Sequence, residues 1–157
     1  MIFPIRFVDT AINNIKTMNT LRLIYDGDQH GTAFKEPQHK SVAIDCPYTG
    51  KGEELSPGNL VGIGVAGCML LSMGALAQRD ELDLQDTVVD IELTETDKPF
   101  AHVDTITLVF NVPRDFAPED RQKLERAAGV CPIKASFRPE TIITAKFDYA
   151  NEVASVT

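Results

Sequence analysis

The sequence predicts a single α+β domain over residues 1–157, with its elements in the order β-β-β-α-β-β-α-α-β. The first observation is size, because 157 residues with 43% apolar and 24% charged residues can form one domain with a substantial core. The second is strand-like alternation of apolar and polar residues, and the third is an uncharged helical stretch at 60–77. We expect antiparallel sheets packed around this long, buried central helix.

Three short strand-like runs open the patterned part of the chain. They are separated by a turn-rich Asp26-Gly27-Asp28 and by polar residues, and Pro47 follows the last of them. We interpret residues 1–17, which precede the first run, as an N-terminal arm or as an extension from an upstream start site. The runs predict a small β-meander over residues 21–25, 32–34 and 41–46.

A long apolar helix is predicted to follow the polar loop at 49–55. Ser56 supplies a side-chain cap and Pro57 suits the first helical position, so the helix should begin there and run to about Gln78. A helix that is apolar on every side must be covered on every side. We expect the chain's own sheet to cover one face and a second copy of the same helix to cover another, which predicts a homodimer.

The uncharged stretch also reaches the length at which a membrane helix must be considered. Its flanks lack the cationic bias that orients membrane helices, since Glu53 and Glu54 precede it and Arg79, Asp80 and Glu81 follow it. We therefore expect no membrane partner. The net charge of −8 also argues against nucleic acid, because phosphate binding depends on clustered Lys and Arg.

The elements after the central helix are predicted from periodicity and charge. Alternation with a period of two predicts strands at 87–95, 105–112 and 141–149, of which the first two should form an antiparallel hairpin. Residues 118–128 have acids in the first turn and basic residues later, which complements a helix dipole and predicts a surface helix. A further short helical stretch is expected to begin at Cys131.

The three cysteines are too few for the disulfide framework of a small secreted protein. With no export signal visible at the start, we expect a reducing, cytoplasmic compartment. Cys68 lies in the apolar helix, where a cysteine is commonly a small hydrophobic residue. Cys131 stands at a helix start, where free N–H groups stabilise a thiolate. Cys46 lacks a charged or helical context and is interpreted as structural.

Neither a metal nor a cofactor is predicted. The histidines and cysteines lack the paired ligand spacing of structural zinc sites. The chain also has no nucleophile-elbow motif and no phosphate-cradling glycine loop after a strand.

Two stretches, GKGEELSPGNLVGIGVAGCMLLSMGALAQ and RAAGVCPIKASF, resemble the osmotically inducible protein C and organic hydroperoxide resistance superfamily, and the likeness extends over roughly residues 21–149. The most specific elements are Ser56-Pro57 leading to Cys68, and Cys131-Pro132. The resemblance implies an OsmC-like intertwined homodimer with two long central helices packed together and sites at the subunit interface. It also implies that Cys68 attacks a peroxide and that Cys131 resolves the product.

The family's peroxidases place an arginine on an early strand and a glutamate in the first turn of the central helix, bridged over the reactive sulfur. In this chain His30 stands at or near the arginine position and Gly58 at or near the glutamate position. We hypothesise that His30 replaces the arginine, paired with Glu53 or Glu54. The alternative for His30 is that it is an exposed turn residue. The alternative for Glu53 and Glu54 is that they belong to a solvated loop. Two further candidate cations are Arg22 and Arg138.

The first functional hypothesis is a thiol-dependent peroxidase that acts in the oxidative stress response. It would reduce a small apolar hydroperoxide through a thiolate, a sulfenic acid and an intramolecular disulfide, without a cofactor, and an external dithiol of unknown identity would restore the thiols. The alternative is a non-catalytic, dimeric binding or stress-associated protein that lacks an efficient thiolate-activating pair. A charged neighbour that stabilises the thiolate matters, because a thiol with a pKa near 8.5 is only about 3% ionised at pH 7.

Overall fold

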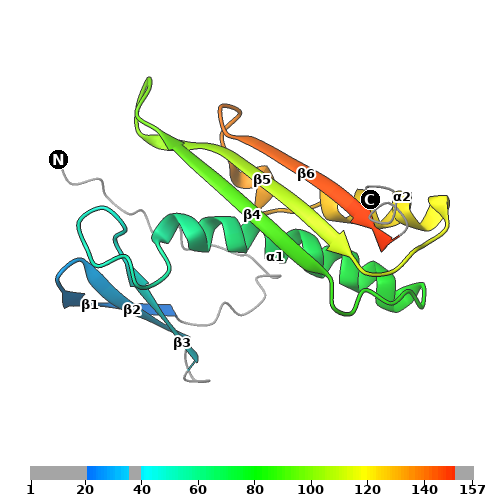
Figure 1. Cartoon of the computed structure of the whole chain (residues 1–157), viewed down its shortest axis with the longest axis horizontal. Coiled ribbons are helices and arrows are strands. Elements are labelled where there is room, and N and C mark those ends of the chain that lie inside the picture. The colour runs from blue at the N-terminus through cyan, green and yellow to red at the C-terminus, as the bar shows by residue number, and fades with distance from the viewer. Residues whose placement is uncertain (1–20, 36–39, 151–157) are drawn as a thin grey trace, which may run out of the picture. The chain divides into compact units, whose positions relative to one another are not determined.

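The computed structural model describes residues 21–35 and 40–150, so the predicted N-terminal arm lies outside the described residues. The chain divides into two compact units, Met1–Glu54 and Leu55–Thr157, and each is described by itself. The α+β class and the order of the elements are confirmed (Figure 1). The short helical stretch predicted after Cys131 is a single 3-10 turn, Lys134–Ser136.

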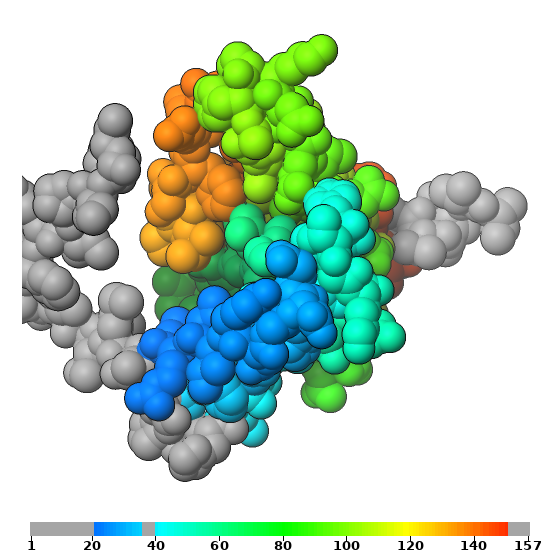
Figure 2. Space-filling model, turned by 90° about the vertical axis from the view of Figure 1, so that its left-hand side faces the viewer, coloured from blue at the N-terminus to red at the C-terminus, as the bar shows by residue number. Residues whose placement is uncertain are grey.

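The N-terminal unit is the predicted antiparallel meander. Its strands, in the order β1-β2-β3, are Leu21–Gly27, His30–Lys35 and Lys40–Asp45. The tight turn between β1 and β2 has left-handed backbone at Gly27, Asp28 and Gln29, a conformation that glycine and aspartate tolerate in turns. Strand β1 lies at the sheet edge and its apolar side chains are exposed. Figure 2 shows the surface of this part of the chain in blue.

A buried carboxylate organises the loop that follows β3. Asp45 is 4% exposed, and its Oδ2 accepts the N–H of Glu53 at 3.2 Å. The N–H of Gly50 donates to the carbonyl oxygen of Cys46 at 2.9 Å, which turns the chain back over the carboxylate. A Cβ at Gly50 would overlap the Asp45 carboxylate and come within 2.7 Å of the Cys46 carbonyl oxygen. The loop therefore requires glycine at this position.

We expect Gly50→Ala to lower the free energy of unfolding of the N-terminal unit by about 1–3 kcal/mol, the usual effect of overpacking. Denaturant unfolding measures the loss, and exchange of the Glu53 amide hydrogen reports it locally, because that amide is bonded to Asp45. Gly129→Ala is the control, since a Cβ there meets nothing within 4 Å. Equal stability of the two variants would contradict the steric argument.

The C-terminal unit is built on helix α1, Pro57–Arg79. The Ser56 side chain accepts the N–H of Asn59 at 3.0 Å, and the Asn59 side chain accepts the N–H of Ser56 at 2.9 Å. This capping box and Pro57 in the first turn fix the start of the helix where the sequence predicted it.

A three-stranded sheet packs on one face of α1, in the order β4-β5-β6 (Figure 1). Strands β4, Val88–Thr96, and β5, His102–Val112, form the predicted antiparallel hairpin. Strand β6, Ile142–Tyr149, pairs parallel to β5, so the expectation of purely antiparallel sheets was wrong on this point. The reason is that helix α2, Pro118–Gly129, carries the chain back to the starting end of β5 as a crossover.

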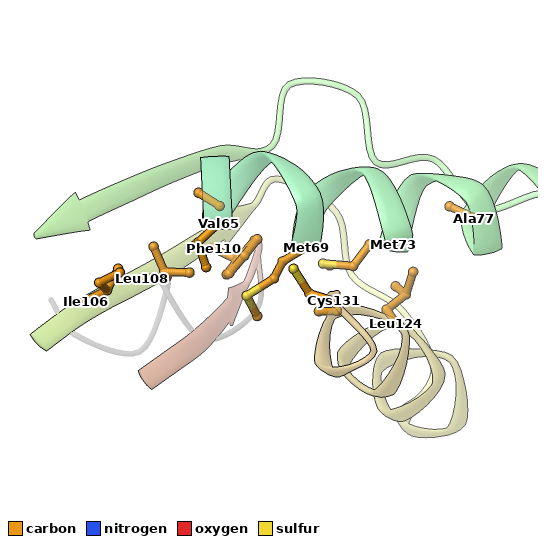
Figure 3. Close-up of a cluster of buried hydrophobic side chains, with 11 residues drawn as sticks. Val65, Met69, Met73, Ala77, Ile106, Leu108, Phe110, Leu124 and Cys131 are labelled. Carbon is orange, nitrogen blue, oxygen red and sulfur yellow. The ribbon is translucent and has the colours of Figure 1, made fainter. Parts of the chain in front are cut away.

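The core of this unit lies between α1, the sheet and α2 (Figure 3). Val65, Met69 and Met73 project from α1 and are at most 1% exposed. The alternation predicted for β5 is confirmed, because every second residue from Ile106 to Val112 is buried. Helix α2 contributes Leu124 and Ala128, each 0% exposed.

Helix α1 is covered on one face by its own chain, and its opposite face is open. Leu71 is 75% exposed and Ile63 is 45% exposed. Helix α1 is also long and apolar enough to cross a membrane, a test that core helices of soluble proteins pass as well. The structure holds a single chain, so the covering of this open face by a second copy of α1 stays a prediction.

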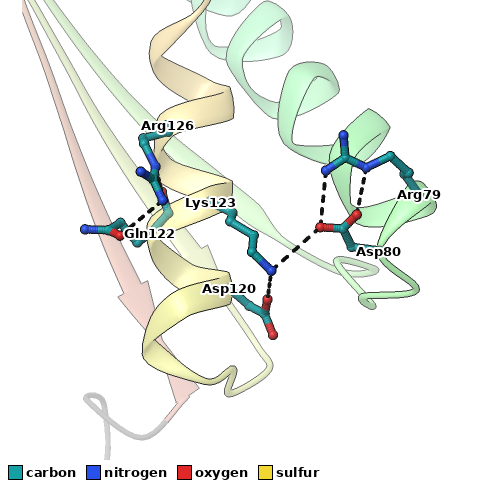
Figure 4. A network of polar contacts seen from close by, with 6 residues as sticks. All are labelled: Arg79, Asp80, Asp120, Gln122, Lys123 and Arg126. Carbon is teal, nitrogen blue, oxygen red and sulfur yellow. Dashed lines mark hydrogen bonds and ion pairs between the residues drawn. The ribbon is translucent and has the colours of Figure 1, made fainter.

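Ion pairs join the end of α1 to α2, as Figure 4 shows. Arg79 Nε lies 2.7 Å from Asp80 Oδ1, and Lys123 Nζ lies 4.0 Å from Asp80 Oδ2 and 2.8 Å from Asp120 Oδ1. The Arg79 guanidinium lowers the pKa of Asp80. Because the cationic side chains Arg79 and Lys123 are 70% and 44% exposed, we expect the network to orient α2 more than to stabilise the unit.

Candidate active site

Cys68 is positioned in the middle of α1, at the border between the buried face and the open face. It packs against the hydrophobic core and is partly buried. Its side chain also lines a shallow apolar groove on the open face, formed by Ile63, Gly64, Gly67, Leu71, Ser72, Ala75 and Pro132. A small apolar molecule in this groove would lie against the Cys68 sulfur.

Cys131 is positioned by the turn that follows α2. It is 3% exposed and belongs to the core cluster, near Met69 and Met73 in Figure 3. The N–H of Lys134 donates to the Cys131 sulfur at 3.3 Å, and the N–H of Ala135 donates to the Cys131 carbonyl oxygen at 3.1 Å. The turn thus presents a backbone donor to a buried sulfur.

The fold brings the two thiols into contact, although they are far apart in the sequence. A hydrogen bond between the Cys68 and Cys131 side chains is the largest of the effects that raise the pKa of Cys68, followed by burial. The backbone N–H of Ile133 opposes the rise. Both cysteines are free thiols in the structure. The spacing alone could not show this contact, because it depends on the packing of α2 against α1.

No cationic side chain from the described residues contributes to the pKa of Cys68, whose causes are Cys131, burial and the Ile133 amide. Arg138, one of the two further candidate cations, lies over the ring of Phe100 at 5.3 Å from its centroid. The other candidate, Arg22, belongs to β1 in the N-terminal unit. With its pKa raised, Cys68 on its own is a protonated thiol at neutral pH.

The other three candidate residues, His30, Glu53 and Glu54, lie together in the N-terminal unit. They line a hollow of about 290 Å³, whose remaining lining residues are Asp26, Gly27, Asp28, Asp45 and Lys51. The five candidates therefore form two groups, one in each unit.

His30 has a carboxylate partner that the sequence analysis did not identify. His30 Nδ1 lies 3.1 Å from Asp26 Oδ2, and the Thr32 hydroxyl donates to the same oxygen at 2.8 Å. Among the described residues the ion pair is with Asp26, not with Glu53 or Glu54 as we had hypothesised. His30 begins β2 and is not a free turn residue. The turn between β1 and β2 brings the imidazole back over Asp26, which fixes its orientation.

A carboxylate also lies where the resemblance implies one. Gly58 stands in the first turn of α1, which has no acidic residue of its own. Glu95, from the end of β4, places its Oε1 3.0 Å from the position that a Cβ of Gly58 would occupy. Sequence analysis missed Glu95, which follows the apolar residues of β4 and lies, like Leu93, against Gly58; only the contact of α1 with β4 reveals it.

Cys46, which the sequence analysis interpreted as structural, has hydrogen-bond donors close to its sulfur. The Thr49 hydroxyl donates to the Cys46 sulfur at 3.1 Å. This bond, together with backbone hydrogen bonds from Tyr48 and Thr49, lowers the pKa of Cys46 to about 7. A thiolate can thus be stabilised by local donors without any charged neighbour.

We expect Cys46 to react with iodoacetamide with a pH midpoint of about 7, because it loses its proton as the pH rises through that value. Cys68, with a raised pKa, should react only at higher pH. Thr49→Val removes the hydroxyl whose hydrogen bond contributes most to the lowered pKa of Cys46. The pH midpoint of the Cys46 reaction should therefore rise in this variant. Peptide mass spectrometry reads each cysteine separately, and an unchanged midpoint in Thr49→Val would contradict the assignment.

No metal centre is visible in the described ranges, because no three His, Cys, Asp or Glu side chains there are grouped to hold an ion. The chemistry that the arrangement offers is that of a thiol pair beside an apolar groove.

Comparisons with known proteins agree with this architecture. A family model described as OsmC-like protein matches residues 50–146. A solved Psychrobacter arcticus protein, described as an osmotic stress induced and detoxification response protein, has a TM-score of 0.78 and 23% identity over 85% of this chain and 98% of that chain. The organic hydroperoxide resistance protein OsmC of Legionella pneumophila has a TM-score of 0.69 and 16% identity over 86% of this chain and 99% of that chain.

A third solved structure, the organic hydroperoxide resistance protein OhrB of Bacillus subtilis, has a TM-score of 0.63 and 18% identity over 83% of this chain and 98% of that chain. No match was found among curated protein sequences. At these identities the structural likeness shows the fold alone.

Proposed function

Because this chain belongs to the OsmC-like protein family, we propose that it is a thiol-dependent peroxidase that reduces organic hydroperoxides. The observation that carries the proposal is the hydrogen-bonded pair of free thiols, Cys68 and Cys131. Structural neighbours described as organic hydroperoxide resistance proteins are consistent with it.

The proposed reaction uses Cys68 as the nucleophile. Its sulfur attacks one oxygen of the hydroperoxide, the O–O bond breaks, an alcohol leaves and Cys68 becomes a sulfenic acid. The Cys131 sulfur then attacks the Cys68 sulfur, forming a disulfide and releasing water. An external dithiol reduces the disulfide and restores both thiols. The contact between the two sulfurs supports rapid closure of the disulfide before further oxidation.

The substrate class follows from the groove beside Cys68. Apart from Ser72, its lining side chains are aliphatic or glycine. The tail of an alkyl hydroperoxide gains about 25 cal/mol for each Å² of apolar surface that it buries, a gain that hydrogen peroxide cannot make. The groove therefore favours alkyl hydroperoxides.

We also propose that the working form is a homodimer, in which a second copy of α1 covers the open face and encloses the groove. Exposed Leu71 and Ile63 support this, because apolar side chains on a helix seek cover. His30, when protonated, is the proposed cation for the reaction. Its support is the ion pair with Asp26, with Glu53 and Glu54 lining the same hollow.

The test is consumption of cumene hydroperoxide with dithiothreitol as the reductant. We expect many equivalents to be consumed per chain, and hydrogen peroxide to be consumed more slowly. Cys68→Ser should abolish turnover, whereas Cys46→Ser should retain it. Consumption that stops at one equivalent, or that survives Cys68→Ser, would contradict the peroxidase.

The second candidate function is a dimeric binding protein without catalysis. The raised pKa of Cys68 favours it, since a protonated thiol is a poor nucleophile. This function predicts no turnover with any dithiol and a Cys68 thiol that titrates above its usual range. Turnover of cumene hydroperoxide by the Cys46→Ser variant distinguishes the two functions, because only Cys68 and Cys131 remain as thiols in it.

A further inference from the structure

Ser72 is the one hydroxyl-bearing residue among the described residues that line the groove beside Cys68. It belongs to α1 and stands one helical turn after Cys68. Residues at this spacing lie on the same face of a helix, with about 5–6 Å between their Cβ atoms. A ligand that contacts the Cys68 sulfur is therefore within reach of the Ser72 hydroxyl.

The hydrogen of the Ser72 hydroxyl is already used within the helix. Ser72 Oγ donates to the carbonyl oxygen of Cys68 at 2.9 Å. A serine hydroxyl has one hydrogen to donate and two lone pairs that accept. Toward the groove Ser72 therefore offers an acceptor and no donor, and the other lining residues, the Cys68 thiol apart, are aliphatic or glycine.

The ligand group that such an acceptor selects is a neutral O–H. An alkyl hydroperoxide has one, on its terminal oxygen, whereas ethers and dialkyl peroxides have none and a carboxylate brings only acceptors. An oxygen that donates to Ser72 Oγ at about 2.7–2.8 Å can also lie about 3–3.5 Å from the Cys68 sulfur, the separation of atoms about to react. The spacing of the two residues therefore suits one oxygen that contacts both side chains.

We propose that Ser72 orients the substrate, because its Oγ accepts the hydrogen bond of the terminal O–H of the hydroperoxide and presents that oxygen to the Cys68 sulfur. This inference rests on the proposed function. The apolar lining of the groove holds the alkyl group, and Ser72 decides which of the two peroxide oxygens is attacked.

Attack at the terminal oxygen balances in atoms and electrons. A bond forms between the Cys68 sulfur and the terminal oxygen, which keeps its hydrogen, and the O–O bond breaks. The other oxygen leaves with the alkyl group and takes the proton of the Cys68 thiol, which gives the alcohol. The sulfur is oxidised by two electrons to a sulfenic acid, and the hydroperoxide is reduced.

Three variants test the Ser72 hydroxyl. Ser72→Ala removes it and should fold, since alanine is the best helix former, whereas Ser72→Thr keeps a hydroxyl that can make the same bond one turn back. The matched control is Ser136→Ala, which removes the same kind of bond, from Ser136 Oγ to the Pro132 carbonyl oxygen at 2.9 Å, at a residue that does not line the groove.

The first measurement is kcat/KM for cumene hydroperoxide. We expect it to fall about tenfold in Ser72→Ala, which corresponds to about 1.4 kcal/mol and lies within the range for one neutral hydrogen bond. Ser72→Thr and Ser136→Ala should stay close to the wild type.

The second measurement reports the hydrogen bond without turnover. Calorimetry gives the dissociation constants of cumyl alcohol, which has an O–H, and of cumyl methyl ether, which has none. We expect the preference for the alcohol over the ether to fall about tenfold in Ser72→Ala and to be kept in Ser72→Thr. A loss of packing alone would weaken the binding of both ligands together.

The outcomes separate this inference from the function beneath it. If Ser72→Ala has the same preference for the alcohol as the wild type, Ser72 is not the acceptor and the inference is overturned, while the peroxidase stands. If the wild type does not turn over cumene hydroperoxide, the proposed function is overturned, and the orienting role with it.

Discussion

Replacing Phe110 by Ala is expected to lower the free energy of unfolding of the C-terminal unit by about 3–5 kcal/mol. Phe110 is 0% exposed on β5, the central strand of the sheet. Its ring stacks on that of Phe147, with 4.8 Å between centroids, and it packs under α1. Removing the ring leaves a cavity lined by several elements that cannot all collapse into it.

Phe100→Ala is the matched control for this prediction, because Phe100 is 41% exposed beside the start of β5. Denaturant unfolding of the two variants compares the same change of side chain at a buried and an exposed site. We expect a clearly smaller loss for Phe100→Ala. Equal losses would contradict the assignment of Phe110 to the core.

Leu71→Glu is expected to dissociate the proposed homodimer. Leu71 is 75% exposed on the open face of α1, beside the Cys68 groove. In a dimer covered at this face, the new carboxylate would be buried without a partner, at a cost of roughly 3 kcal/mol, which raises the dissociation constant about 100-fold. Light scattering coupled to size-exclusion chromatography over a dilution series measures the shift.

Val88→Glu serves as the control for Leu71→Glu. Val88 is 57% exposed at the start of β4, on the face of the sheet opposite α1. We expect this variant to remain dimeric. If Leu71→Glu has the same mass as the wild type at every concentration, α1 is not the dimer face and the enclosed groove is wrong.

Several elements could be predicted from the sequence because local patterns specify them. The inward residues of β5 follow from alternation with one buried face, and the start of α1 follows from Ser56-Pro57. The direction of β6 did not follow, since alternation is the same in parallel and antiparallel strands. Here α2 between β5 and β6 was the available signal for a parallel crossover.

The site was less accessible to sequence reasoning, because its contacts join distant segments. Cys68 and Cys131 could be named from their motifs, but their contact depends on helix packing. Asp26 was overlooked as the partner of His30 because a tight turn separates them. The hydrogen bonds to the Cys46 sulfur are local. Thr49, three residues after the cysteine, was therefore a signal for them in the sequence itself.

The most direct test of the proposed thiol pair is peptide mapping of the oxidised cysteines after one equivalent of cumene hydroperoxide. We expect a disulfide between Cys68 and Cys131, with Cys46 still reduced although its pKa is about 7, since Cys46 does not line the apolar groove. A disulfide that includes Cys46, or oxidation confined to Cys46, would contradict the central claim that Cys68 and Cys131 carry the reaction.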